Sequence, residues 1–239
     1  MTAQTAESSQ RGPARVAGIA YLLTFAVVVS ANFGIIARLS VPGDAVATAR
    51  NVLASEGLFR LYIACNTLYV AGVVVLLTAL YVLLAPVHRG LALLAAVFRL
   101  IFGLMWLLAA ILPYFVLRLL HGAPYLNVFE TQQLHALAKL YLGGGFETYY
   151  VGLPFYGMAS TVCSYLWFKS GQIPRWLALW GVIASGWCVL TAFAFLAIPN
   201  FENTVNVWLF DSPMVLFELA VGGWLLFKGV RPGITGSPQ

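Results

Sequence analysis

The chain has 239 residues, of which 61% are hydrophobic and 9% are charged. Soluble domains carry roughly 25% charged residues, so this composition excludes an ordinary soluble domain and predicts a membrane protein with little extramembrane structure. The net charge of +5 does not indicate nucleic-acid binding, because the basic residues stand singly near the ends of apolar runs. There they set topology and contact anionic lipid headgroups, so membrane lipids are the expected partners and nucleic acid is not.

Six apolar runs approach the ~20 residues that cross a bilayer. In chain order they cover residues 14–38, 58–84, 91–119, 146–168, 176–198 and 213–228. The fold class predicted is therefore all-α, a polytopic membrane bundle of six transmembrane helices. Residues 1–13 are predicted to be a disordered tail, residues 14–230 the transmembrane domain, and residues 231–239 a C-terminal tail.

The longest connection, residues 121–145, has apolar residues at roughly helical spacing in the segment NVFETQQLHALAKLYL. This pattern predicts an amphipathic helix that lies on the outer face or folds over the bundle as a lid. The glycines 143–145 would be its hinge. A surface helix that only covers the interface remains an equal alternative.

The short connections HRG and KSGQIPR, around Arg89 and Arg175, carry basic residues and would lie on the same side as the N-terminus. Short basic connections stay in the cytoplasm. An even number of spans returns the chain to the side where it began, so both termini are predicted to be cytoplasmic.

Two charges lie inside apolar runs, Arg99 in LALLAAVFRLIFGLMWLLAAIL and Glu218 in DSPMVLFELAVGGWLLF. A charge at the bilayer centre costs at least ~2.5–3.5 kcal/mol and normally has a partner and a role. At a rise of ~1.5 Å per residue, Arg99 lies ~13 Å from the inner end of its run and Glu218 ~10 Å from the outer end. In a hydrocarbon core of ~30 Å their levels are close enough for a long arginine side chain to connect.

Two interpretations of this pair remain open. In the functional one, Arg99 binds an anionic head or holds Glu218 ionised. In the structural one, the ion pair only locks two helices together.

Other polar residues are candidates for the same site. Acids that begin helices or share the Glu218 stripe could serve as proton donors at a cavity mouth; the candidate catalytic residues are Glu218, Asp211, Glu147 and Glu56. Polar and aromatic residues at depth could contact a substrate; the candidate binding residues are Arg99, Asn66, Tyr62, Tyr69 and Trp106. For Asn66 alone, simple interhelical hydrogen bonding is the favoured explanation.

No cofactor and no metal site are predicted. The chain lacks HExxH, Walker, GxSxG and dinucleotide motifs. His121, Glu130 and His135 are poorly spaced for a metal. The three cysteines lie in apolar runs without a CxxC pair, which favours their packing as small hydrophobic residues.

Several segments together resemble a known family. They are ARVAGIAYLLTF, TALYVLLAPVHRGLALLAAVFRL, LPFYG, SYLWFKSGQIPRWLALWGV and FELAVGGWLLFKGV, of which SG-x-IPR-x-L and E-x(5)-WLL-x-KGV are the most specific. The chain resembles the bacterial multi-span membrane proteins grouped as DUF4386. The resemblance covers nearly the whole chain, implies six spans in a bacterial cytoplasmic membrane, and implies no particular chemistry.

Three functions from different classes are compatible with the sequence. The first is a membrane-embedded enzyme that acts on a lipidic or isoprenoid substrate by acid–base chemistry, similar in plan to small membrane terpene cyclases. The second is a non-catalytic scaffold or partner subunit in which the ion pair is structural. The third is a small transporter, against which the chain shows no evident inverted repeat.

Overall fold

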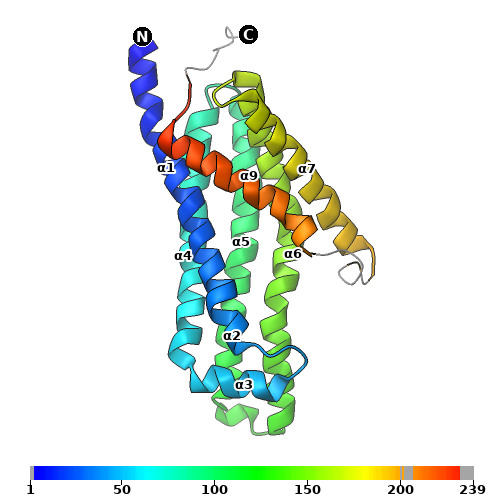
Figure 1. The fold of residues 1–239 in the computed structure, drawn as a ribbon. Helices are drawn as coiled ribbons and strands as arrows, with labels where there is room; N and C mark the ends of the chain where they lie inside the picture. The colour runs from blue at the N-terminus through cyan, green and yellow to red at the C-terminus, as the bar shows by residue number, and fades with distance from the viewer. Residues whose placement is uncertain (1–2, 200, 202–206, 232–239) are drawn as a thin grey trace. The chain divides into compact units, whose positions relative to one another are not determined.

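A computed structural model describes residues 3–199, 201 and 207–231, and of residues 3–9 and 207–211 it describes the backbone alone. The described residues contain helices and no strand, which confirms the all-α fold class (Figure 1). In chain order the elements are α1 (Ala3–Val29), a π-helix (Ser30–Ile36), α2 (Ala37–Leu39), α3 (Ala45–Ala54), α4 (Glu56–Leu84), α5 (Arg89–Leu120), a 3₁₀ turn (Pro124–Leu126), α6 (Thr131–Ser170), α7 (Arg175–Ala197) and α9 (Val207–Phe227).

Within the described ranges, four stretches are long and apolar enough to cross a membrane. They are Gln10–Leu39, Glu56–Leu84, Arg89–Leu120 and Arg175–Ala197. The apolar part of α9, Ser212–Phe227, is shorter than a full span, and α6 carries many hydroxyl and aromatic residues that lower its hydropathy. The chain is thus a membrane-type helical protein, and the count of six spans stays a prediction.

Two helix boundaries differ from the sequence prediction. α1 begins at Ala3 rather than at residue 14, so it includes residues that were assigned to the tail. α6 runs without interruption from Thr131 to Ser170. The prediction of a separate amphipathic helix with a hinge at residues 143–145 is therefore wrong. Glycine costs only ~1 kcal/mol in a helix interior, and Gly144 lies close against Leu112, where close packing between helices favours a residue without a side chain.

The chain divides into two compact units. The first comprises Met1–Thr24, Gly72–Gly103 and Tyr150–Gln239, and the second comprises Phe25–Ala71 and Leu104–Tyr149.

The first unit packs α9 against α1 and α7 at glycines (Figure 1). A Cβ on Gly18 would lie 2.6 Å from the backbone nitrogen of Leu226, and one on Gly181 would overlap the ring of Phe217. Small residues of this kind let membrane helices approach closely. Gly181 is therefore a close contact between α7 and α9 inside the protein.

The second unit has an apolar core that includes Val52 of α3, Phe59 of α4 and Val116 of α5. Lys139 of α6 connects this helix to the segment from Ser40 to Thr48. Its Nζ donates to Ser40 Oγ at 2.8 Å, to the Val41 carbonyl at 2.9 Å and to Thr48 Oγ1 at 3.3 Å. Burial lowers the pKa of Lys139, and the nearby Asp44 carboxylate partly opposes this shift.

Candidate functional site

Arg99 lies on the buried face of α5. It shares this face with Ala92, Ala95 and Phe102, at the three- and four-residue spacing that aligns side chains along a helix. Only 3% of the Arg99 side chain is exposed. The small alanines on the same face leave room for the long side chain to extend across the interior of the first unit.

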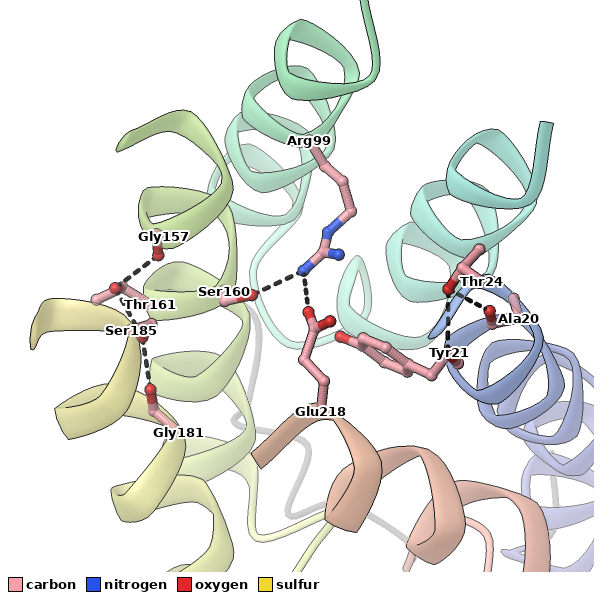
Figure 2. A network of polar contacts seen from close by, with 10 residues as sticks. All are labelled: Ala20, Tyr21, Thr24, Arg99, Gly157, Ser160, Thr161, Gly181, Ser185 and Glu218. Carbon is pink, nitrogen blue, oxygen red and sulfur yellow. Dashed lines mark hydrogen bonds and ion pairs between the residues drawn. The ribbon is translucent and has the colours of Figure 1, made fainter. Parts of the chain in front are cut away.

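The Arg99 guanidinium connects three helices of that unit (Figure 2). Its Nη2 donates to Ser160 Oγ of α6 at 2.7 Å and to Glu218 Oε1 of α9 at 3.2 Å. The predicted pairing of Arg99 with Glu218 is therefore confirmed. The Glu218 side chain is 19% exposed, so the acid is the more accessible member of the pair.

Two tyrosine rings enclose the guanidinium. Its central carbon lies 5.6 Å from the ring centre of Tyr21 on α1 and 5.2 Å from that of Tyr156 on α6. Both rings are almost fully buried. Desolvated cation–π contacts at this range stabilise a cation by about 2 kcal/mol. We call Tyr21, Arg99, Tyr156, Ser160 and Glu218 the arginine centre.

Two buried polar atoms of the arginine centre have no hydrogen-bond partner among the described residues. They are Arg99 Nε and the Tyr21 hydroxyl. Figure 2 shows the Tyr21 hydroxyl directed toward the Glu218 carboxylate. An unsatisfied buried donor costs about 1–3 kcal/mol, and in a native structure such a group calls for an explanation such as an unseen water or ion, or a functional role.

A small pocket adjoins Arg99. Side chains of α4 and α5, together with Cys163 of α6, line it; on α4 these are Leu77, Leu80, Tyr81 and Leu84, and on α5 Ala92, Ala95, Ala96 and Arg99. Its volume is about 10 Å³, the scale at which a cavity admits a single water molecule. Apart from Arg99 and Tyr81, its lining residues are apolar.

One hydrogen bond joins α6 to α7 directly beside Ser160 (Figure 2). Thr161 Oγ1 donates to Ser185 Oγ at 2.8 Å, and within α7 Ser185 in turn donates to the Gly181 carbonyl. Hydroxyl contacts between helices help to join membrane helices. The Thr161–Ser185 bond thus helps to hold the part of α6 that carries Ser160.

Four of the predicted binding residues lie together in the second unit instead. The Trp106 indole nitrogen donates to Asn66 Oδ1 at 2.9 Å, and the Trp106 ring lies 4.5 Å from that of Tyr69. Asn66 also donates to the carbonyl of Tyr62 at 2.8 Å. The Trp106–Asn66 hydrogen bond joins α4 to α5, as polar side chains commonly do between membrane helices. These residues do not belong to the arginine centre.

The predicted acids are distributed as well. Glu56 accepts from Arg60 at 2.7 Å and lies 3.2 Å from His121 Nε2. Partners of this kind favour an ionised carboxylate rather than a proton donor. Glu147 is exposed on α6, and the side chain of Asp211 lies outside the described residues. Glu218 is thus the candidate acid that the described part of the chain brings to Arg99.

Among the described residues no group of three histidine, cysteine or acidic side chains is arranged to hold a metal ion. The arginine centre itself contains a guanidinium, a carboxylate, a serine hydroxyl and two phenols, which can bind anions and exchange protons.

Sequence reasoning missed Ser160, Tyr21 and Tyr156. One signal was present, because Tyr156 and Ser160 stand four residues apart and therefore lie on one face of α6. Hydroxyl and tyrosine side chains are common in this chain, so this spacing becomes informative only once both side chains are seen to contact Arg99.

Comparison with known proteins identifies the family of the chain and gives no information about its activity. The chain belongs to the family described as "Domain of unknown function (DUF4386)", whose model matches residues 16–229. No curated protein and no solved structure matches the chain.

Proposed function

We propose that the protein is a six-span enzyme of the bacterial cytoplasmic membrane, with both termini in the cytoplasm, that acts on a lipidic molecule with an anionic head. In this proposal Arg99 holds the head and Glu218 transfers protons to or from the substrate. Exposed apolar side chains cover the helices, so such a molecule would approach the site through the bilayer.

One observation carries the proposal. Arg99 Nε is buried and has no acceptor within the described part of the chain, although the same guanidinium is already paired with a carboxylate through Nη2. Arginine recognises carboxylate and phosphate through two parallel N–H groups. The unused Nε–H therefore offers a second donor to an anionic group.

The roles follow from exposure and charge. Arg99 is always protonated and well buried, which suits an orienting group. Glu218 is partly accessible and can gain or lose a proton, which suits general acid–base catalysis. An isoprenoid with an anionic head is one member of this substrate class. Because Arg99 lies against the Tyr21 and Tyr156 rings, the ring faces that it occupies are not available to stabilise a carbocation.

Lipid identification tests this function. We expect the purified protein to retain an anionic amphiphile that mass spectrometry detects, and the variant Arg99→Leu to lose it. Arg118→Leu, which removes an exposed arginine from the same helix, is the matched control and should retain it. Equal lipid content in all three proteins would contradict the proposal.

A second candidate function is a non-catalytic membrane scaffold or partner subunit in which the arginine centre is a structural lock. The pocket volume of about 10 Å³ and the tight glycine contacts of α9 favour it. Replacement of a buried ion pair by apolar residues is often neutral or stabilising. In this case a double variant, Arg99→Met with Glu218→Leu, should fold and retain the phenotype of the wild type, whereas the enzyme proposal expects loss of activity.

A further inference from the structure

The arginine centre has more buried donors than acceptors. Arg99 Nε and the Tyr21 hydroxyl are both without a partner among the described residues, and each side chain is 3% exposed. Glu218 accepts one hydrogen bond from Arg99, through Oε1. Two donors from different helices thus remain for the oxygens of an added anionic group.

We propose that the arginine centre binds the carboxylate of an amphiphile in exchange for the Glu218 carboxylate, and that each exchange takes up one proton from the solvent. This inference rests on the proposed function, because it names the head group that Arg99 receives. The ligand carboxylate takes the place beside Arg99, and the proton goes onto Glu218, which leaves as a neutral carboxylic acid. No covalent bond forms or breaks.

Charge balance requires the proton. Arg99 and Glu218 together carry no net charge, whereas Arg99 with two carboxylates would leave one buried negative charge unpaired. An unpaired charge at membrane depth costs several kcal/mol, and a like charge nearby disfavours the ionised form of a carboxyl group. Protonation of Glu218 restores the neutral site, and its 19% exposure gives the proton access.

The surroundings of Glu218 supply no second cation among the described residues. The titratable groups coupled electrostatically to it are Tyr21 from α1, Arg99 from α5 and Cys163 from α6. α7 faces α9 with Gly181 and Trp180, which pack on Phe217 and do not titrate. Arg99 is therefore the only positive charge described here that can compensate an incoming anion.

Size and charge favour a carboxylate over a phosphate. The pocket beside Arg99 holds about 10 Å³, the scale of a single water molecule, and Glu218 does not line it, so we place the entering head at the position of the Glu218 carboxylate. A planar carboxylate has the size and charge of the group that it replaces. A phosphate has more oxygens and can carry more negative charge than that group.

Calorimetric titration of the purified protein in an uncharged detergent tests this exchange. Dodecanoate is the probe and dodecanol the matched neutral control, at about pH 8, where a fatty-acid carboxylate is ionised. Titration in two buffers of different ionisation enthalpy gives the number of protons taken up per ligand. The variants are Glu218→Gln, which keeps Arg99 and the shape of the acid, and Arg99→Leu.

We expect the wild type to bind dodecanoate with uptake of one proton, and its affinity to fall by about tenfold per pH unit as the pH rises. Glu218→Gln should bind without proton uptake and without this pH dependence, and Arg99→Leu should not bind. Binding that depends on Arg99 but takes up no proton would overturn the exchange and leave the proposed function intact. Equal binding of dodecanol, or absence of binding in both the wild type and Glu218→Gln, would overturn the proposed function as well.

Discussion

Replacement of Glu218 by glutamine isolates the charge of the ion pair from its shape. Removal of one partner from a buried pair costs about 3–5 kcal/mol, because the other charge remains uncompensated. Here Glu218 is 19% exposed, Ser160 keeps its hydrogen bond to the same nitrogen, and the glutamine carbonyl can still accept from Arg99. We therefore expect Glu218→Gln to lower the free energy of unfolding by about 2–3 kcal/mol, at or below the lower end of that range.

For a chain of this length each kcal/mol shifts the unfolding midpoint by about 2–4 °C, so Glu218→Gln should lower it by about 4–12 °C. Thermal unfolding in detergent, followed by tryptophan fluorescence, measures this shift. Glu147→Gln, which neutralises an exposed acid of α6, is the matched control and should leave the midpoint unchanged.

The double variant Arg99→Met with Glu218→Leu should be more stable than the sum of its single variants predicts, by at least about 1 kcal/mol, because contacting residues couple. Strict additivity, or a Glu218→Gln protein as stable as the wild type, would refute the claim that the two charges compensate each other.

The remaining predictions concern packing, hydrogen bonds and protonation. Gly181→Ala should lower the free energy of unfolding by about 1–3 kcal/mol through overpacking. Gly186→Ala on the same helix, where a Cβ meets no atom within 4 Å, should not lower it. Equal effects of the two substitutions would contradict the close contact at Gly181. Lys139→Met should raise hydrogen exchange in the segment from residue 40 to residue 48, where Lys139 now donates three hydrogen bonds. Burial lowers the pKa of Lys139 below its ordinary 10.5, so just below pH 10.5 the unfolded chain binds more protons than the folded one. The free energy of unfolding should therefore rise with pH in this range, and it should rise less in Lys139→Met. An identical pH dependence in the two proteins would contradict the lowered pKa. Trp106→Phe should cost about 1 kcal/mol by leaving Asn66 Oδ1 without its indole donor, and an unchanged midpoint in chemical denaturation would argue against that bond.

The sequence predicted those parts of the fold that depend on local composition. Apolar runs bounded by glycine, proline and basic residues located α4, α5 and α7 to within a few residues, because a bilayer requires long uninterrupted helices. It failed at residues 143–145, where three glycines suggested a hinge although α6 continues through them. The small free-energy cost of glycine in a helix is outweighed there by the stability of the helical residues on both sides.

The candidate site was predicted in part. Depth along two helices was enough to pair Arg99 with Glu218, because the rise per residue is constant. Depth does not give the rotation of a helix about its axis, so neither the contribution of Ser160 nor the stacking of Tyr21 and Tyr156 could be derived. For the same reason Asn66, Tyr69 and Trp106 were grouped with Arg99, whereas the structure gives them hydrogen bonds and ring contacts of their own.

The most direct test of an anion site at Arg99 is a density map of the purified protein in a lipid bilayer disc with dodecanoate added. We predict density for an elongated molecule whose head lies within hydrogen-bond distance of Arg99 Nε and the Tyr21 hydroxyl, with Glu218 turned away from Arg99. An unchanged Arg99–Glu218 contact with no added density beside Nε would contradict the account and assign the pair to the structural lock.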